Sequence, residues 1–233
     1  MAALFSETDK RPKNNIIRLP CEPGEVVYNI QQYDADFDKQ KLYTVKIDYT
    51  KSVMNKPTKE ELNALRDECF NIACDHGFHD EVHSERHFLC LVITELCEAV
   101  EADRKDRHAD LKSFNQSVET DYVPIATAFE GYIKDSVEDE LADAAIRILD
   151  LAGMNGDDLD LDHSRAGTVY YFTDHTFAES IYEIIEWTII GGYEYGFSCL
   201  FMLADALGFD LMEHIRLKMQ YNRTRERLHG KKY

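Results

Sequence analysis

Two stretches of sequence decide the fold of this chain: VITELCEAVEADRK at residues 92–105 and EDELADAAIRILDLAG at residues 138–153. Apolar residues recur in both at spacings of three and four, which is the pattern of an amphipathic helix with one buried face. Ser84 and Ser136 stand where the N-cap of each helix is expected, and Gly153 stands where the second helix is expected to end. The two stretches therefore predict long helices that pack their apolar stripes together.

Each of these helices carries two acids one turn apart, Glu95 and Glu98 in the first and Glu140 and Asp143 in the second. Residues three apart are neighbours on a helix surface, so packing of the two stripes is expected to bring four carboxylates to one edge of the interface. Two like charges about 4 Å apart repel by about 4 kcal/mol at an effective dielectric constant of about 20. Of the four acids, only Asp143 has a basic residue three or four positions away, Arg147. The cluster is therefore predicted to bind a cation, and oxygen ligands without His or Cys favour Mg²⁺ or Mn²⁺.

The pattern of the rest of the chain is mostly helical. Helices are expected over residues 58–77, 84–107, 136–153, 175–190, 193–207 and 209–228. Helices joined by short connections indicate an all-α bundle, here a single domain over residues 58–233. Residues 109–134 interrupt the helical pattern and are expected to form an ordered loop or insertion. Residues 1–57 are expected to form an N-terminal arm, with a small β-hairpin or edge appendage at Val26–Ile30 and Leu42–Tyr49.

The composition excludes several classes of protein. The chain has 233 residues, of which 44% are hydrophobic and 30% charged, and this suits a globular protein with a sizeable core. Its formal net charge of -18 disfavours binding to nucleic acid or to an anionic membrane. The six cysteines contain no CxxC pair, so reduced thiols in a cytoplasmic protein are expected in place of a zinc ribbon or a redox dithiol. No apolar run reaches the roughly 18–20 residues of a membrane span, and we expect no signal peptide.

The acidic motifs resemble those of the all-α nucleoside triphosphate pyrophosphatases, the MazG-like superfamily that includes the dimeric dUTPases. The signature of that superfamily is ExxE on one helix and ExxD on the next, matched here by Glu95 with Glu98 and by Glu140 with Asp143. The resemblance covers the chain from about residue 58 to its end. The linker between the two motifs is longer than is usual in the superfamily.

The C-terminal segment KMQYNRTRERLHGKK, residues 218–232, is similar to the closing segment of the same family. It contains a Lys, an Asn and an Arg, at Lys218, Asn222 and Arg225, that the resemblance implies contact the substrate. These three residues are also spaced to lie on one face of the predicted last helix, which supports a site for the polyphosphate. Thr94 is a departure, because many members of the family have a second Glu at that position.

The resemblance implies hydrolysis of a nucleoside triphosphate to the monophosphate and pyrophosphate, with Mg²⁺ bound to the four acids. Bound Mg²⁺ neutralises phosphate charge and activates an attacking water, and Glu98 is our candidate for the base that takes a proton from that water. A homodimer or higher homo-oligomer is expected, because the helices predicted at 175–190 and 193–207 carry apolar residues on nearly every face. The base and the sugar of the nucleotide are left open.

Several alternatives stay open. Pairs of acids at this spacing are common on the solvated faces of amphipathic helices. The histidine-rich stretch HGFHDEVHSERH contains His79-Asp80, which an HD-type phosphohydrolase would use, although further ligands for such a site are not evident downstream. Glu183 and Glu186, followed by Asp205, form either a second metal pair or a buried subunit interface. A non-catalytic helical protein that binds nucleotides or partners with the same fold is the alternative function.

Overall fold

The chain forms two compact units, residues 1–53 and 54–233, in the computed structural model. In the first unit the structure describes the backbone of three strands. In the second unit it describes residues 57–120, 122–161, 172, 175–230 and 232. The core and the candidate site lie in the second unit.

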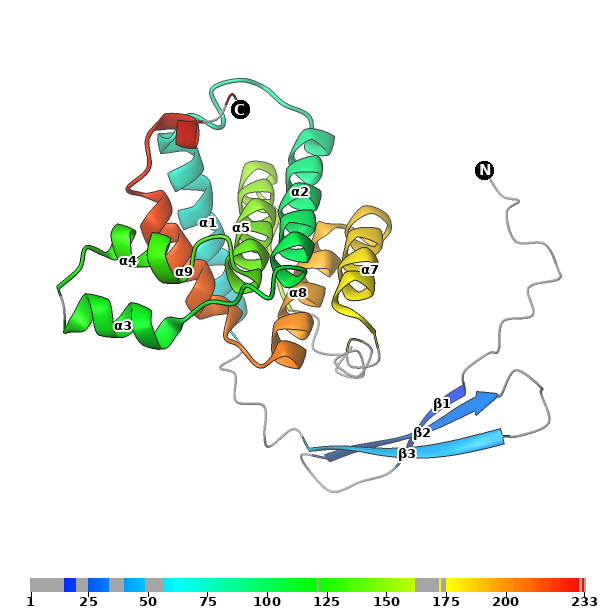
Figure 1. Ribbon diagram of the computed structural model, residues 1–233. Coiled ribbons are helices and arrows are strands. Elements are labelled where there is room, and N and C mark those ends of the chain that lie inside the picture. The colour runs from blue at the N-terminus through cyan, green and yellow to red at the C-terminus, as the bar shows by residue number, and fades with distance from the viewer. Residues whose placement is uncertain are drawn as a thin grey trace. The chain divides into compact units, whose positions relative to one another are not determined.

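The second unit is all-α in the part that the structure describes, which confirms the predicted fold class (Figure 1). Its helices are α1 (Lys59–Asp75), α2 (Glu85–Asp103), α3 (Leu111–Glu119), α4 (Ile125–Tyr132), α5 (Val137–Asn155), α7 (Phe177–Ile190), α8 (Tyr193–Leu207) and α9 (Leu211–Asn222). A short 3₁₀ turn, Arg227–Gly230, follows α9. The central helix is α5, because α1, α2, α8 and α9 all pack against it and 12 of its 19 residues are buried.

The first unit contains an antiparallel sheet with the strand order β1-β2-β3. The strands are β1 (Asn15–Leu19), β2 (Glu25–Tyr33) and β3 (Gln40–Asp48). β2 and β3 pair along their whole length, with Tyr28 opposite Val45. The segments expected to be extended, 26–30 and 42–49, fall on β2 and β3, except that Tyr49 lies outside the described residues.

Helices α1, α2 and α5 begin where the sequence predicts, with Thr58, Ser84 and Ser136 at their N-cap positions. Thr58 and Glu61 form a capping box at the start of α1: each side chain accepts a hydrogen bond from the other residue's backbone N–H, at 2.8 and 3.2 Å. Ser136 caps α5 by accepting a hydrogen bond from the backbone of Asp139 at 3.2 Å. Ser84 occupies the N-cap position of α2 without a side-chain hydrogen bond. Side-chain capping therefore marks the start of α1 and of α5, the helix that carries Glu140 and Asp143.

Residues 109–134, expected to be a loop or insertion, contain the two short helices α3 and α4. These helices enclose a second, smaller core, in which Phe114, Phe129 and Ile133 are buried with Tyr221 of α9. The rings of Phe129 and Tyr221 stack with their centroids 4.6 Å apart. Helices of nine and eight residues are too short for their periodicity to stand out, and the surface that covers their apolar side comes from a distant part of the chain.

The predicted end of α5 at Gly153 is wrong. The helix continues to Asn155 and ends at Gly156, whose φ of 73° is the left-handed conformation that favours glycine. Gly153 is instead a packing residue, because a Cβ at this position would lie 2.5 Å from the Cβ of Phe70 on α1. The absence of a side chain at Gly153 lets α1 approach α5 closely.

We expect Gly153→Ala to destabilise the protein, although Ala is favoured over Gly in a helix by about 1 kcal/mol. The added methyl group would push α1 away from α5, and overpacking of this kind costs about 1–3 kcal/mol. Gly131→Ala is the matched control, because Gly131 is also helical and no atom lies within 4 Å of its would-be Cβ. Urea unfolding followed by circular dichroism measures both, and equal stabilisation by the two substitutions would contradict the close approach at Gly153.

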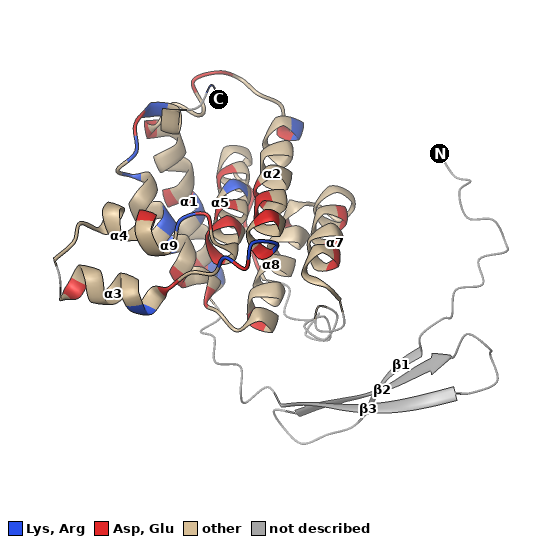
Figure 2. Ribbon diagram, in the orientation of Figure 1, with Lys and Arg blue, Asp and Glu red and all other residues tan. Residues whose placement is uncertain are grey.

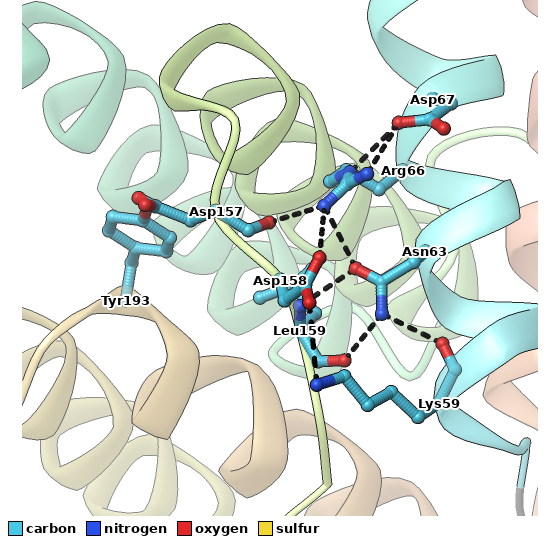
Figure 3. A network of polar contacts seen from close by, with 8 residues as sticks. All are labelled: Lys59, Asn63, Arg66, Asp67, Asp157, Asp158, Leu159 and Tyr193. Carbon is cyan, nitrogen blue, oxygen red and sulfur yellow. Dashed lines mark hydrogen bonds and ion pairs between the residues drawn. The ribbon is translucent and has the colours of Figure 1, made fainter.

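A polar network joins α1 to the segment that follows α5 (Figure 3). Arg66 donates hydrogen bonds to the carbonyl oxygen of Asp157 at 2.7 Å and to Asn63 Oδ1 at 2.9 Å. Asn63 also exchanges two hydrogen bonds of 2.9 Å with the backbone of Leu159. Tyr193, at the start of α8, donates to the side chain of Asp157. The network attaches α1 and α8 to the C-terminal end of α5 and so supports the helix that carries most of the site.

None of the described helices is by itself both long and apolar enough to cross a membrane. Only α8 and α9 reach that length and composition together, and the chain bends by 111° between them. Both helices place side chains in the core of the second unit.

Candidate metal centre

Three of the four predicted carboxylates come together where α2 packs along α5. Ligand oxygens of Glu95, Glu140 and Asp143 all lie within 4.8 Å of one another. Glu95 is 4% exposed and Glu140 is 5% exposed, while Asp143 is partly buried. Figure 2 shows acidic positions gathered on this part of α2 and α5. A cation between these oxygens would contact acids from both helices.

The fourth predicted ligand, Glu98, lies one turn beyond Glu95 on α2, and its side chain is exposed. Glu98 is not one of the acids whose oxygens lie within 4.8 Å of one another. Its charge nevertheless contributes to the raised pKa of Glu140, so the two carboxylates are close enough to interact. Glu98 therefore borders the cluster on the side that water can reach.

The cluster carries negative charge that its surroundings only partly compensate. Burial, and then the charges of Asp143 and Asp139, raise the pKa of Glu140 to about 8. Burial also raises the pKa of Asp139, in opposition to the nearby ammonium of Lys218. A divalent cation bound by these carboxylates would favour their ionised form.

Basic side chains from two helices offset part of this charge. Arg147 of α5 donates a hydrogen bond from Nε to Oε1 of Glu95 on α2 at 3.1 Å. Lys218 of α9 lies 2.9 Å from both carboxylate oxygens of Asp139 and 2.7 Å from Oδ2 of Asp143. Each basic residue therefore joins one predicted metal ligand to a neighbouring helix.

Asp139 is a part of the site that sequence reasoning missed. The Asp139 side chain is 1% exposed, and its Oδ2 accepts a hydrogen bond from the backbone N–H of Asp135 at 2.9 Å. Asp135, Asp139 and Glu140 form a second group of acids whose ligand oxygens lie within 4.8 Å of one another. An acid in the first turn of a helix is ordinarily explained by the helix dipole, which hides any further role. The signal that could have revealed Asp139 is its spacing of four residues from Asp143, which places both on one face of α5.

The structure places the three predicted phosphate-binding residues in different surroundings. The last helix, α9, ends at Asn222 and not near residue 228, so Arg225 lies beyond the helix and does not share a helical face with Lys218. Lys218 is 4% exposed and its ammonium is already bound by carboxylates. Asn222 is 6% exposed, and its Oδ1 is buried without a hydrogen-bond partner in the described part of the chain. Arg225 is partly buried and donates to the carbonyl oxygen of His229 at 3.1 Å.

Asn222 and Arg225 line a small cavity of about 50 Å³ that reaches the acid cluster, since Asp143 and Arg147 are part of the same wall. Arg225 and His229 also line a more open groove of about 530 Å³, whose other side is formed by α4. Arg225 therefore stands between the groove and the cavity that leads to the acids. Asn222, whose buried Oδ1 has no hydrogen-bond partner among the described residues, also lines this cavity.

The competing histidine and acidic motifs do not form a metal-binding group within the described residues. His79 Nε2 lies 2.7 Å from Oδ1 of the buried Asp150, and the His79 ring stacks on Phe88, so this histidine has a structural role. On α7, Glu183 is partly buried and Glu186 is exposed. Neither acid belongs to a convergent set of ligands among the residues that the structure describes.

No protein-family model, no curated protein and no solved structure matches this chain. Its function is therefore inferred from the side chains of the candidate site.

Proposed function

We propose that this chain is a Mg²⁺-dependent nucleoside triphosphate pyrophosphohydrolase of the all-α type, which converts a nucleoside triphosphate and water into the monophosphate and pyrophosphate. Such an activity would serve to clear unwanted nucleotides from the cellular pool. The observation that carries the proposal is the convergence of Glu95, Glu140 and Asp143 from two helices within 4.8 Å. Arg147 and Lys218 offset part of the repulsion among these acids, and a bound cation would offset the rest.

The donor set suits Mg²⁺ or Mn²⁺. These ions prefer oxygen ligands, and Mg²⁺ usually keeps several waters while one or two carboxylates and substrate phosphates complete its coordination. Glu95, Glu140 and Asp143 would supply the carboxylates, and Glu98 stands at the exposed edge of the same cluster. When bound, the metal would neutralise the triphosphate and lower the pKa of a coordinated water.

Glu98 is our candidate for the general base. Its exposed carboxylate borders the cluster, so a water held beside the acids could pass a proton to it. The water oxygen would bond to the α-phosphorus, the bond from that phosphorus to the bridging oxygen would break, and pyrophosphate would leave with the electron pair. Water itself is the nucleophile, so the reaction needs no nucleophilic Ser or Cys.

The C-terminal segment offers the substrate a place next to the acids. A groove of about 530 Å³ falls within the range of about 300–1,000 Å³ that is common for ligand sites. Arg225 lines both this groove and the inner cavity, where its planar guanidinium would contact phosphate oxygens. In the inner cavity, Asn222 Oδ1 would accept a hydrogen bond from the ligand or from a water that the ligand orders.

A pyrophosphate-release assay with Mg²⁺ and the common ribonucleoside and deoxyribonucleoside triphosphates tests the proposed activity. We expect release from at least one nucleotide and none in the presence of EDTA. The second candidate is a non-catalytic nucleotide-binding or interaction protein of the same fold, favoured by the ammonium of Lys218 that already neutralises Asp143. Nucleotide-dependent thermal stabilisation without pyrophosphate release would support that alternative, and the absence of both effects would exclude both functions.

We expect Arg225→Ala to raise the KM for the nucleotide by about 10- to 100-fold, with a smaller change in kcat. Hydrogen bonds to a charged group contribute about 1.5–3 kcal/mol, which corresponds to that range. Arg223→Ala is the matched control, because Arg223 is exposed and pairs with Glu68 of α1. Steady-state kinetics compares the two variants, and an unchanged KM in Arg225→Ala would place the substrate elsewhere.

We further propose that the chain forms at least a homodimer through the exposed side of α7. Tyr182, Trp187, Ile189 and Ile190 are large apolar side chains between 40% and 72% exposed on this helix. Water contact with such a patch is unfavourable, and burial against a second copy would remove it. Sedimentation equilibrium should show a dimer or larger species that Ile190→Asp dissociates. A wild-type protein that is monomeric at micromolar concentration would contradict this expectation.

A further inference from the structure

The ion pair between Asp139 of α5 and Lys218 of α9 is almost completely enclosed, since the two side chains are 1% and 5% exposed. The ammonium lies 2.9 Å from both oxygens of Asp139 and 2.7 Å from Oδ2 of Asp143. An ammonium group has three N–H donors and no acceptor. Two carboxylates therefore occupy most of the hydrogen-bonding capacity of Lys218 and leave little of it for a phosphate.

The surroundings hold both partners in place. The backbone N–H of Asp135 donates to Oδ2 of Asp139 at 2.9 Å, which fixes the orientation of that carboxylate. On the side of α4, the ring of Phe129 lies with its centroid 5.6 Å from the ammonium of Lys218, and Phe129 is fully buried. The α3–α4 segment thus contributes a cation–π contact and a hydrophobic cover to this ion pair.

We propose that Asp139 is a positioning residue that fixes the ammonium of Lys218 beside Asp143, so that Lys218 acts as an internal counter-ion of the metal-binding acids and not as a ligand of the substrate. The inference rests on the proposed function only in taking Glu140 and Asp143 as metal ligands. Oδ2 of Asp139 accepts a hydrogen bond from Lys218 at 2.9 Å and Oδ1 lies 2.9 Å from the same ammonium, while Oδ2 of Asp143 lies 2.7 Å from it. The ammonium is therefore held between the two carboxylates, where it offsets part of the charge of Asp143.

The proposal makes opposite predictions for the two partners of the ion pair. In Asp139→Asn, Lys218 keeps Asp143 as its charged partner and competes there with the metal, so metal affinity falls. In Lys218→Met, the competing charge is gone and metal affinity rises. A unit charge about 5 Å away at an effective dielectric constant of about 20 is enough to change affinity by at least about tenfold in each direction.

The test is a double-mutant cycle with two readouts that require no turnover. Wild type, Asp139→Asn, Lys218→Met and the double variant are compared by urea unfolding without metal and by Mn²⁺ titration followed by electron paramagnetic resonance. We expect each single variant to be less stable than wild type, because each leaves a buried charge with fewer partners. The double variant should regain stability relative to the less stable single variant and bind Mn²⁺ at least as tightly as wild type.

Asp150→Asn is the matched control. Asp150 is another buried acid of α5, about two helical turns after Asp143, and it has a basic partner in His79. It should lose stability without a change in Mn²⁺ affinity, and Lys218→Met should not compensate for it. An Asp139 with a purely structural role would behave in the same way as Asp150, and that result would overturn the proposal. The proposal would also be overturned if the effects of the two substitutions on stability and on Mn²⁺ affinity simply added, or if the double variant failed to fold.

A Lys218 that bound the triphosphate would give a different pattern. Lys218→Met would then raise the KM for the nucleotide while Mn²⁺ affinity stayed unchanged, and this outcome too would overturn the proposal. Failure of the proposed function can be distinguished from failure of this inference. A chain that releases no pyrophosphate can still show coupled effects of the Asp139 and Lys218 substitutions on stability and on Mn²⁺ affinity.

Discussion

Glu140→Gln should abolish Mg²⁺-dependent hydrolysis and, in the same protein, raise the stability of the metal-free fold. The loss of turnover is expected to be at least about a thousandfold, because a catalytic metal supplies several kcal/mol of transition-state stabilisation and each 1.4 kcal/mol is a factor of ten. The gain in stability arises because Gln removes an acid that is buried beside Asp143 and Asp139. Opposite effects on activity and stability are typical of a functional acid held in an unfavourable environment.

The stability gain should depend on pH in a defined direction. The pKa of Glu140 is raised in the fold to about 8, so between its ordinary value and about pH 8 the folded state binds more protons than the unfolded state. Stability of the metal-free wild type therefore falls as the pH rises through this window. Near pH 5, Glu140 is protonated in the fold and Gln resembles it closely, so the gain is small. At pH 8 we expect a gain of about 2 kcal/mol, less than the whole pKa shift implies because the surrounding groups can rearrange around the charged side chain.

Thermal unfolding in EDTA at pH 5.5 and pH 8 measures this difference directly. Glu138→Gln is the control on the same turn of α5, because Glu138 interacts with His108 and the backbone of Ala109 and belongs to neither group of convergent acids in the described residues. Glu138→Gln should lose stability or leave it unchanged. A Glu140→Gln variant that is less stable than wild type at pH 8 would show that the carboxylate is a structural acid.

Glu98→Gln should reduce kcat by about 10²- to 10⁴-fold, the range in which a positioned general base contributes. The fold should be unaffected, because Glu98 is exposed on α2. Gln keeps the size of the side chain and can still accept a hydrogen bond from water, but it cannot take a proton. Single-turnover kinetics at saturating Mg²⁺ separates this loss from weaker metal binding.

Glu101→Gln is the corresponding control, one turn further along α2. Glu101 is exposed and pairs with Arg104 and Lys105, so its loss should leave kcat within about twofold. Wild-type turnover in Glu98→Gln would remove Glu98 from the mechanism and assign proton transfer to another group. The buried acids would remain candidates for metal binding.

The sequence predicts the framework of the site well because local rules govern it. Thr58 and Ser136 cap helices through interactions with residues three positions away, and the spacing of apolar residues identifies the faces of α2 and α5 that pack together. The convergence of Glu95 with Glu140 and Asp143 follows once those two faces meet. These features depend on residues that are close in sequence or on a single helix pair.

The features that sequence reasoning missed depend on contacts between distant segments. Lys218 is a basic residue on an amphipathic helix, and only the packing of α9 on α5 brings it against Asp139, 79 residues earlier. Gly153 resembles a helix terminator until the approach of Phe70 shows why a side chain is excluded there. The charges of the site can be read from the sequence, whereas the pairing of those charges cannot.

The most direct test of the account is the position of the metal itself. Crystals of the wild-type protein soaked in Mn²⁺ should show an anomalous difference peak at about 2.0–2.3 Å from carboxylate oxygens of Glu95, Glu140 and Asp143. The ammonium of Lys218 should remain against Asp139 in the same crystals. The absence of a peak at saturating Mn²⁺, or a peak held by other residues alone, would contradict the central claim that these acids form a metal centre.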